Sequence, residues 1–141
     1  MKTARFAAYA CLIFLAVTSI AGAIPMILNP DGEPVGMPQS LLEHSPFHSY
    51  LIPGIVLLMA NGLLSLWTLG CLLREASGYP LWVAAQGGVL MGWLIVEITI
   101  LRTVVWAHYV YLGVALMLIA SGLRLREPAA MLGEVPEDFV I

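Results

Sequence analysis

Long apolar runs alternate with short polar breaks along this chain. Four runs are close to the roughly 20 residues that a helix needs to cross a hydrocarbon core of about 30 Å. They cover approximately residues 6–28, 53–73, 81–101 and 105–123. The breaks hold turn-forming residues, as in the NPDG sequence at 29–32 and the SGYP sequence at 77–80. The pattern predicts an all-α fold, a bundle of four transmembrane helices.

The composition supports a membrane protein with one domain. Hydrophobic residues make up 60% of the chain and charged residues only 11%, whereas soluble domains carry about a quarter charged residues. A chain of 141 residues that crosses a bilayer four times has no room for a soluble domain, so residues 1–141 form a single membrane domain. Residues 127–141, with two prolines and several acids, predict a short, partly ordered tail.

Positive charge is distributed unevenly between the two sides of the predicted bundle. One side carries Lys2, Arg5, Arg74, Arg124 and Arg126. The other side carries Arg102 alone and a long first loop, residues 29–52, with acids and no Lys or Arg. Because cytoplasmic loops retain Lys and Arg, both termini are predicted to be cytoplasmic. The net charge of -3 is dispersed and no basic cluster occurs, which argues against a nucleic-acid partner.

The first span has an alternative interpretation as a signal peptide. Lys2 and Arg5, the apolar stretch and the Ala21-Gly22-Ala23 sequence together imitate a cleavable signal. The apolar run continues past this point to Leu28, which favours an uncleaved span. Cleavage would leave three spans in the same orientation.

Catalytic motifs are missing from the sequence. Cys11 and Cys71 lie inside apolar runs without a C-x-x-C pair, which argues against a disulfide-forming oxidoreductase. No G-x-S-x-G elbow, Walker A loop or H-E-x-x-H pattern occurs. A non-enzymatic protein is therefore the favoured interpretation, and no cofactor is predicted.

Polar and small residues gather on particular faces of the second and third spans. The second span carries one stripe of Gly54, Asn61, Ser65 and Thr68. On the third span Gln86, Trp93 and Glu97 share one face, and Ala84, Gly88 and Gly92 form a small-residue row nearly opposite. This predicts a central third span with its polar face on the stripe of the second. Alternatively, Gly88 and Gly92 contact a second copy of the chain in a homodimer.

Glu97 is the candidate functional residue, because it is the only acid well inside a span, where charge is costly. It lies about five residues, or roughly 7 Å, from the outer end of the third span. His108 lies at a similar depth in the fourth span, and His44, His48 and Arg102 are on the same side. The predicted ligand-binding set is Glu97, His108, His44, His48, Arg102, Asn61 and Trp93.

These residue types suit several kinds of site. Histidines and a carboxylate can coordinate a divalent metal, transfer protons or hold haem between two imidazoles. No recognised ligand spacing is present, so no metal is assigned. The plainer alternative is that Glu97 only forms a structural pair with Arg102 or His108.

The first loop is too apolar for a solvated linker. Leu41, Leu42, Phe47 and Leu51 predict a short helix that lies at the membrane interface or folds over the bundle mouth. Tyr50, Trp106 and Tyr109 are expected to form an outer belt of aromatic side chains.

The same loop carries a resemblance to known proteins. The sequences PDG at 30–32, GMP at 36–38, LLEHSPF at 41–47 and LIPG at 51–54, with Gly92-Trp93, resemble a family of uncharacterised four-span bacterial membrane proteins. The resemblance covers most of residues 30–115. It implies a multi-pass protein of the bacterial inner membrane and implies no activity.

Three functional hypotheses follow. The first is a non-enzymatic bundle that binds a lipid-like or small apolar ligand, or a larger membrane partner, through its outer half. The second is a metal- or haem-binding redox enzyme or subunit that uses the outer histidines. The third, an ion or proton pathway along Asn61, Gln86 and Glu97, lacks the chain of ionisable groups that a relay needs.

Overall fold

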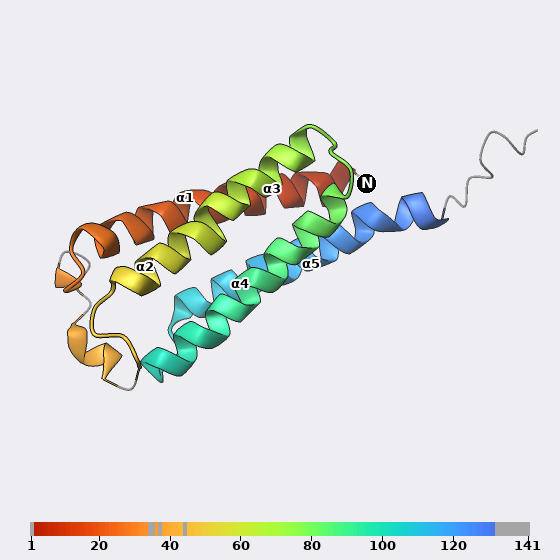
Figure 1. Ribbon diagram of the computed structural model, residues 1–141. Helices are drawn as coiled ribbons and strands as arrows, with labels where there is room; N and C mark the ends of the chain where they lie inside the picture. The colour runs from red at the N-terminus through yellow and green to blue at the C-terminus, as the bar shows by residue number, and fades with distance from the viewer. Residues whose placement is uncertain (1, 34–35, 37, 44, 132–141) are drawn as a thin grey trace, which may run out of the picture.

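The computed structural model describes residues 2–33, 36, 38–43 and 45–131, and over these residues it is helical without strands (Figure 1). Residues 51–73 form one continuous helix made of three parts, the middle of which is a π-turn. The elements are α1 (Lys2–Leu28), the 3-10 turn η2 (Gln39–Leu42), α2 (Leu51–Leu57), the π-helix η3 (Leu58–Leu63), α3 (Leu64–Leu73), α4 (Tyr79–Leu101) and α5 (Trp106–Met131).

Four helices in the described part of the chain are long and apolar enough to cross a membrane, which confirms the predicted number of spans. They are Lys2–Leu28, Leu51–Leu73, Tyr79–Leu101 and Trp106–Arg126. Large apolar side chains cover their outer surfaces; Ile95, for example, is 62% exposed. Such a surface is stable only where lipid covers it.

Helix α5 continues past Arg126 and through Pro128 to Met131, so the first five residues of the predicted tail are helical. Residues 132–141 lie outside the described part of the chain.

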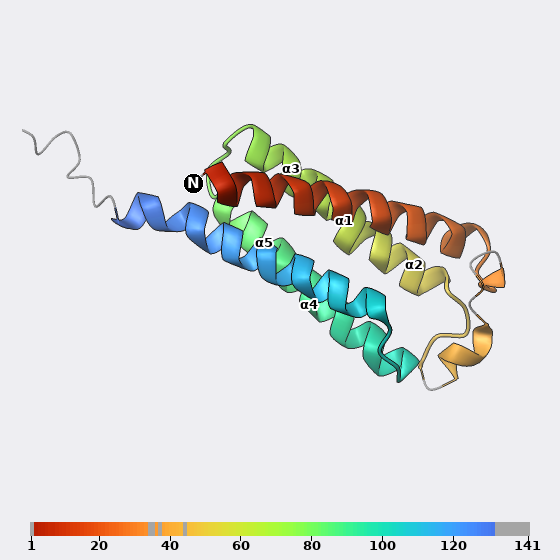
Figure 2. The ribbon, with the colours of Figure 1, turned by 180° about the vertical axis from the view of Figure 1, so that it is seen from behind.

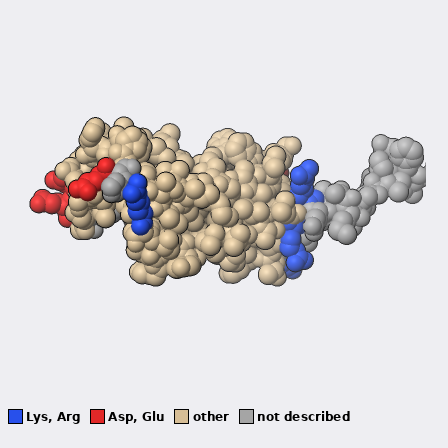
Figure 3. Space-filling view, turned by 90° about the horizontal axis from the view of Figure 1, so that it is seen from below, with Lys and Arg blue, Asp and Glu red and all other residues tan. Residues whose placement is uncertain are grey.

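The helices form two hairpins, and their connections define two ends of the bundle (Figure 1). We call the end with Lys2, the α3–α4 turn and the last turns of α5 the terminal end. We call the end with η2 and the α4–α5 turn the loop end. Most exposed Lys and Arg side chains lie at the terminal end and the exposed acids of the first loop lie at the loop end, with an apolar band between them (Figure 3).

The four helices are arranged in a ring. Helix α1 contacts the α2–α3 helix and α5, and α4 contacts α3 and α5. The expectation of a central third span was therefore wrong, because α4 takes one of four equivalent places in the ring. Helices α1 and α4 face each other across the bundle.

Glycines bring the helices of each hairpin close together. A Cβ at Gly54 would lie 2.9 Å from the Cβ of Met26 on α1. On the other hairpin, a Cβ at Gly87 would lie 2.6 Å from the Ala115 carbonyl oxygen, and one at Gly122 would lie 2.5 Å from the Ala84 nitrogen. Only glycine permits these approaches, so each hairpin packs tightly within itself.

Packing between the two hairpins is uneven along the bundle. A large apolar cluster, which includes Leu12, Leu72 and Leu118, joins all four helices. A small separate cluster at the loop end contains Met26, Leu42 and Tyr50. The hairpins diverge toward the loop end (Figures 1 and 2), and a cavity lies between the two clusters.

Candidate functional site

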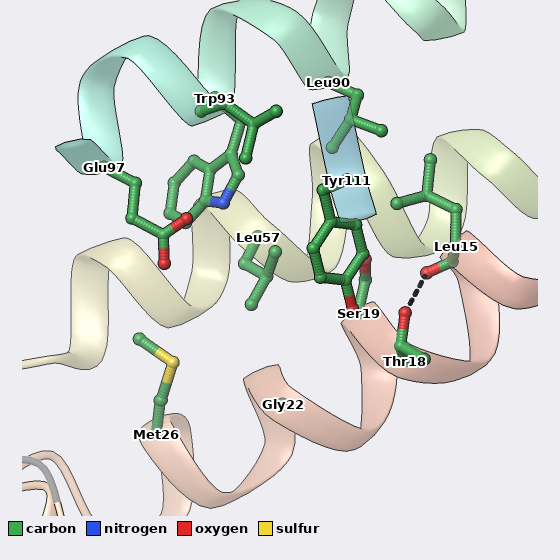
Figure 4. Close-up of a pocket in the computed structure, with 11 residues that line it drawn as sticks. Leu15, Thr18, Ser19, Gly22, Met26, Leu57, Leu90, Trp93, Glu97 and Tyr111 are labelled. Carbon is green, nitrogen blue, oxygen red and sulfur yellow. Dashed lines mark hydrogen bonds between the residues drawn. The ribbon is translucent and has the colours of Figure 1, made fainter. Parts of the chain in front are cut away.

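The cavity between the hairpins has a volume of about 250 Å³ (Figure 4). Side chains from α1, α2, α4 and α5 line it, and most of them are apolar. The lining residues are Leu15, Thr18, Ser19, Gly22, Met26, Leu57, Leu90, Trp93, Leu94, Glu97 and Tyr111.

Small side chains on α1 leave this volume empty. At Gly22 the nearest atom that a Cβ would meet is Leu57 Cδ2, at 3.7 Å. Ser19, one turn earlier, also lines the cavity. Leu15 and Leu90 of the large apolar cluster close the side toward the terminal end, and Met26 of the small cluster closes the side toward the loops. The cavity therefore exists because neither cluster extends across residues 19–22.

Glu97 brings a carboxyl group into this apolar space. Its side chain is 32% exposed and points from α4 into the cavity, beside the ring of Trp93 (Figure 4). Glu97 and Trp93 also line a second cavity, of about 30 Å³, under Leu42 and Tyr50. The carboxyl group thus lies where the main cavity meets the first loop.

His108 contacts Glu97 from the first turn of α5. Its Nε2 lies 3.5 Å from Oε2 of Glu97, and its side chain is 6% exposed. Its Nδ1 accepts a hydrogen bond of 2.9 Å from the backbone N–H of Val105, the residue that precedes α5. This is half of a capping box, with histidine in the place that Glu or Gln usually takes.

Arg102 and His48, two of the remaining predicted site residues, lie apart from the Glu97–His108 pair. Arg102 ends α4 in the left-handed conformation, with φ of 52°, and its exposed side chain forms no ion pair within the described residues. His48 is exposed in the first loop, and His44 lies outside the described residues. In the part of the chain that the structure describes, no three His, Cys, Asp or Glu side chains gather as a metal site would require.

Asn61 belongs to a separate polar group in the bundle interior. Asn61, Ser65, Thr68 and Gln86 are each at most 1% exposed. The Gln86 Nε2 donates to the Ala60 carbonyl oxygen in the π-turn, at 3.1 Å, and the Ser65 hydroxyl donates to the Asn61 carbonyl oxygen, at 2.6 Å. The polar stripe of the second span therefore does face Gln86, although the contact is to the backbone.

The predicted small-residue row on the third span divides between two surfaces. Ala84 packs against Gly122 on α5. Gly88 and Gly92 are exposed, and a Cβ at either position would meet no described atom within 4 Å. Contact of Gly88 and Gly92 with a second copy of the chain stays a prediction.

Sequence reasoning missed the contribution of α1 and Tyr111 to the cavity. Thr18, Ser19 and Gly22 lie on one side of α1, and Tyr111 extends from α5 toward Ser19 (Figure 4). The spacing of Ser19 from Gly22, three residues, is typical of one helix face. This small-residue spacing in α1 was a signal that the first span borders an open space.

Tyr50 anchors the first loop. Its hydroxyl donates to the Pro38 carbonyl oxygen at 2.9 Å and its N–H donates to the Pro30 carbonyl oxygen at 2.8 Å. The side chain is 1% exposed, and burial raises the pKa of the phenol. Tyr50 was predicted to belong to an outer aromatic belt, and its burial shows that this prediction was wrong. Trp106 and Tyr109, the other two residues predicted for the belt, are 78% and 69% exposed.

The cavity combines an apolar lining with one carboxyl group. No protein-family model, curated protein or solved structure matches this chain. An apolar volume with a carboxyl group at one end can hold a hydrocarbon body and hydrogen-bond a polar head. The geometry of this cavity is accordingly the basis for a functional proposal.

Proposed function

We propose that this chain is a non-enzymatic, multi-pass protein of the bacterial inner membrane that binds a small apolar or lipid-like ligand between its two hairpins. The cavity of about 250 Å³ with Glu97 at its loop end is the observation that carries the proposal. Both termini are cytoplasmic in this proposal, and the cavity lies in the outer half of the bundle.

The size and lining of the cavity support an apolar ligand. At about 30 Å³ for each water-sized group, it holds roughly eight non-hydrogen atoms. Leucines, Met26 and two aromatic rings supply most of its surface. Bundle interiors are otherwise close-packed, so an empty volume of this size forfeits dispersion contacts that a bound hydrocarbon would restore.

A glycine on α1 offers a direct test of ligand binding. In Gly22→Leu the new side chain projects toward Leu57 and occupies the cavity. Gly113→Leu is the matched control, because Gly113 is exposed on α5 and a Cβ added there would meet no described atom within 4 Å. Both proteins would be reconstituted in phosphatidylcholine nanodiscs with a photoreactive eight-carbon alcohol.

We expect the probe to label cavity residues of the unmodified protein, as mapped by mass spectrometry. Labelling should fall about tenfold in Gly22→Leu, which corresponds to about 1.4 kcal/mol of binding free energy, and should not change in Gly113→Leu. No cavity labelling in the unmodified protein, or equal labelling in the two variants, would refute the proposal. Size-exclusion profiles and circular dichroism check that both variants fold.

The orientation is supported by charge at the two ends. Exposed Lys2, Arg74, Arg124 and Arg126 lie at the terminal end, and positive residues favour the cytoplasmic side. Reporter fusions after residues 35 and 77 test this. We expect a cytoplasmic signal only at residue 77, and a cytoplasmic signal at residue 35 would overturn the orientation.

The competing redox hypothesis has a simple experimental test. It would use His108 and Glu97, the two predicted ligands that the structure brings together. A Soret band or a stoichiometric metal in the detergent-purified protein, lost in His108→Ala, would favour that hypothesis over the non-enzymatic one.

A further inference from the structure

The hydrogen bonds of His108 determine where its proton lies. Because Nδ1 accepts from the Val105 N–H at 2.9 Å, it carries no proton, and the proton of the neutral ring is on Nε2. Nε2 is the atom that faces Glu97 Oε2, at 3.5 Å. A second proton, on Nδ1, would place the Nδ1–H of His108 against the backbone N–H of Val105.

With His108 neutral, no described side chain would supply a countercharge to an ionised Glu97. The two cavities that Glu97 lines are bordered on α1 by Thr18, Ser19, Gly22 and Met26 and on α2 by Pro53 and Leu57. Leu42 and Tyr50 of the first loop and Tyr111 of α5 also line them. None of these groups is cationic, and Arg102 forms no ion pair with Glu97.

Trp93 adds a second feature that favours a cation. It lies one turn before Glu97 on α4 and lines the same two cavities, with its ring beside the carboxyl group (Figure 4). An aromatic face and a carboxylate at one point are the groups that bind ammonium ions. The carboxylate also has acceptor positions to spare, because an ionised carboxyl group offers about four.

We infer that the ligand carries a protonated primary amine, which Glu97 and Trp93 bind while its hydrocarbon body fills the cavity between the hairpins. This inference rests on the proposed function and names the class of ligand: a cationic amphiphile with roughly eight non-hydrogen atoms inside the protein. The ammonium group donates to the Glu97 carboxylate, a charge-assisted hydrogen bond. Nε2 of His108 lies 3.5 Å from the same carboxyl group.

Three photoreactive probes with the same eight-carbon chain test the inference. They end in an ammonium, a hydroxyl or a carboxylate group, and they are compared in phosphatidylcholine nanodiscs at neutral pH. We expect the amine to label the cavity about tenfold more efficiently than the alcohol, the ratio expected when a charge-assisted bond replaces a neutral one. The carboxylate probe should label least.

Variants identify the group responsible. Glu97→Gln should remove the preference for the amine, so that the amine and the alcohol label this variant to the same extent. Glu43→Gln, which removes an exposed acid of the first loop, should retain the preference and so controls for general attraction to negative charge. An alcohol that labels as well as the amine, or a preference that survives in Glu97→Gln, would overturn the inference.

The failure of this inference differs from the failure of the proposed function. If the alcohol labels the cavity and the amine has no advantage, the cavity binds a neutral ligand and only the amine is wrong. If no probe labels the cavity, the proposed function itself is wrong. Adding phosphatidylethanolamine to the nanodiscs identifies the source of the bound amine. If this lipid reduces labelling by the amine probe, the ligand amine is a lipid headgroup. If labelling is unchanged, the ligand is a free amine.

Discussion

Nε2 of His108 lies 3.5 Å from Oε2 of Glu97, so the first turn of α5 and the last turns of α4 meet at one carboxylate–imidazole contact. The opposite ring nitrogen caps α5 through the Val105 N–H. The His108 side chain therefore has two partners, the Val105 N–H and the Glu97 carboxyl group. The capping bond sets the tautomer, and the tautomer presents a donor to Glu97.

Removal of the cap should destabilise the protein. We expect His108→Leu to lower the free energy of unfolding by about 1–2 kcal/mol, because the Val105 N–H loses its acceptor. His108→Asn should recover much of this loss, since the Asn Oδ1 takes the place of Nδ1. Thermal unfolding in detergent, followed by circular dichroism, gives the comparison. Equal losses in the two variants would show that the cap contributes nothing.

Adjacent glycines on α4 should respond oppositely to the same substitution. Gly87→Ala should cost about 1–3 kcal/mol, because its Cβ would lie 2.6 Å from the Ala115 carbonyl oxygen. Gly88→Ala is the control: no described atom lies within 4 Å, and alanine is the better helix former by about 1 kcal/mol. The same unfolding measurement tests both. A Gly88→Ala variant that unfolds as early as Gly87→Ala would contradict the packing of the α4–α5 hairpin.

Gln86 should stabilise the π-turn of the second span. Gln86→Leu removes the donor to the Ala60 carbonyl oxygen and should cost about 1 kcal/mol, as interhelical hydrogen bonds in membranes do. Asn61→Leu should change stability by less than about 0.5 kcal/mol, because neither polar atom of the Asn61 side chain has a partner among the described residues. A large loss in Asn61→Leu would instead indicate a bound partner such as an internal water.

The first loop should detach when Tyr50 loses its proton. Burial raises the pKa of the phenol in the folded protein, so the unfolded or undocked chain ionises first. The stabilisation is complete below the ordinary tyrosine value of about 10 and is lost as the pH rises through the raised pKa. Amide hydrogen exchange in residues 39–43, after division by the intrinsic base-catalysed rate at each pH, should therefore accelerate above about pH 10.

Tyr50→Phe provides the control for this pH dependence. It should exchange about fivefold faster in residues 39–43 at neutral pH, a ratio equivalent to about 1 kcal/mol for the lost bond to Pro38. It should also lack the acceleration at high pH. An unchanged pH profile in Tyr50→Phe would show that another group controls the loop.

The four helices and their polar interior faces follow from the amino-acid sequence alone. Each span is a run of apolar residues, and run length is a property of a single segment. The inward orientation of Glu97 and Gln86 is also a property of a single segment, because a polar residue inside an apolar run turns away from lipid whatever the positions of the neighbouring helices. These predictions required no knowledge of how the helices pack.

Which of the candidate residues meet depends on how the helices pack against one another. Glu97 contacts His108, whereas Arg102, which ends α4 in a left-handed conformation, forms no ion pair within the described residues. The cavity depends on close approaches at Gly54, Gly87 and Gly122 within the hairpins and on missing bulk at Ser19 and Gly22 between them. Helix periodicity describes one helix at a time, whereas a cavity is the difference between the space enclosed by four helices and the volume of their side chains.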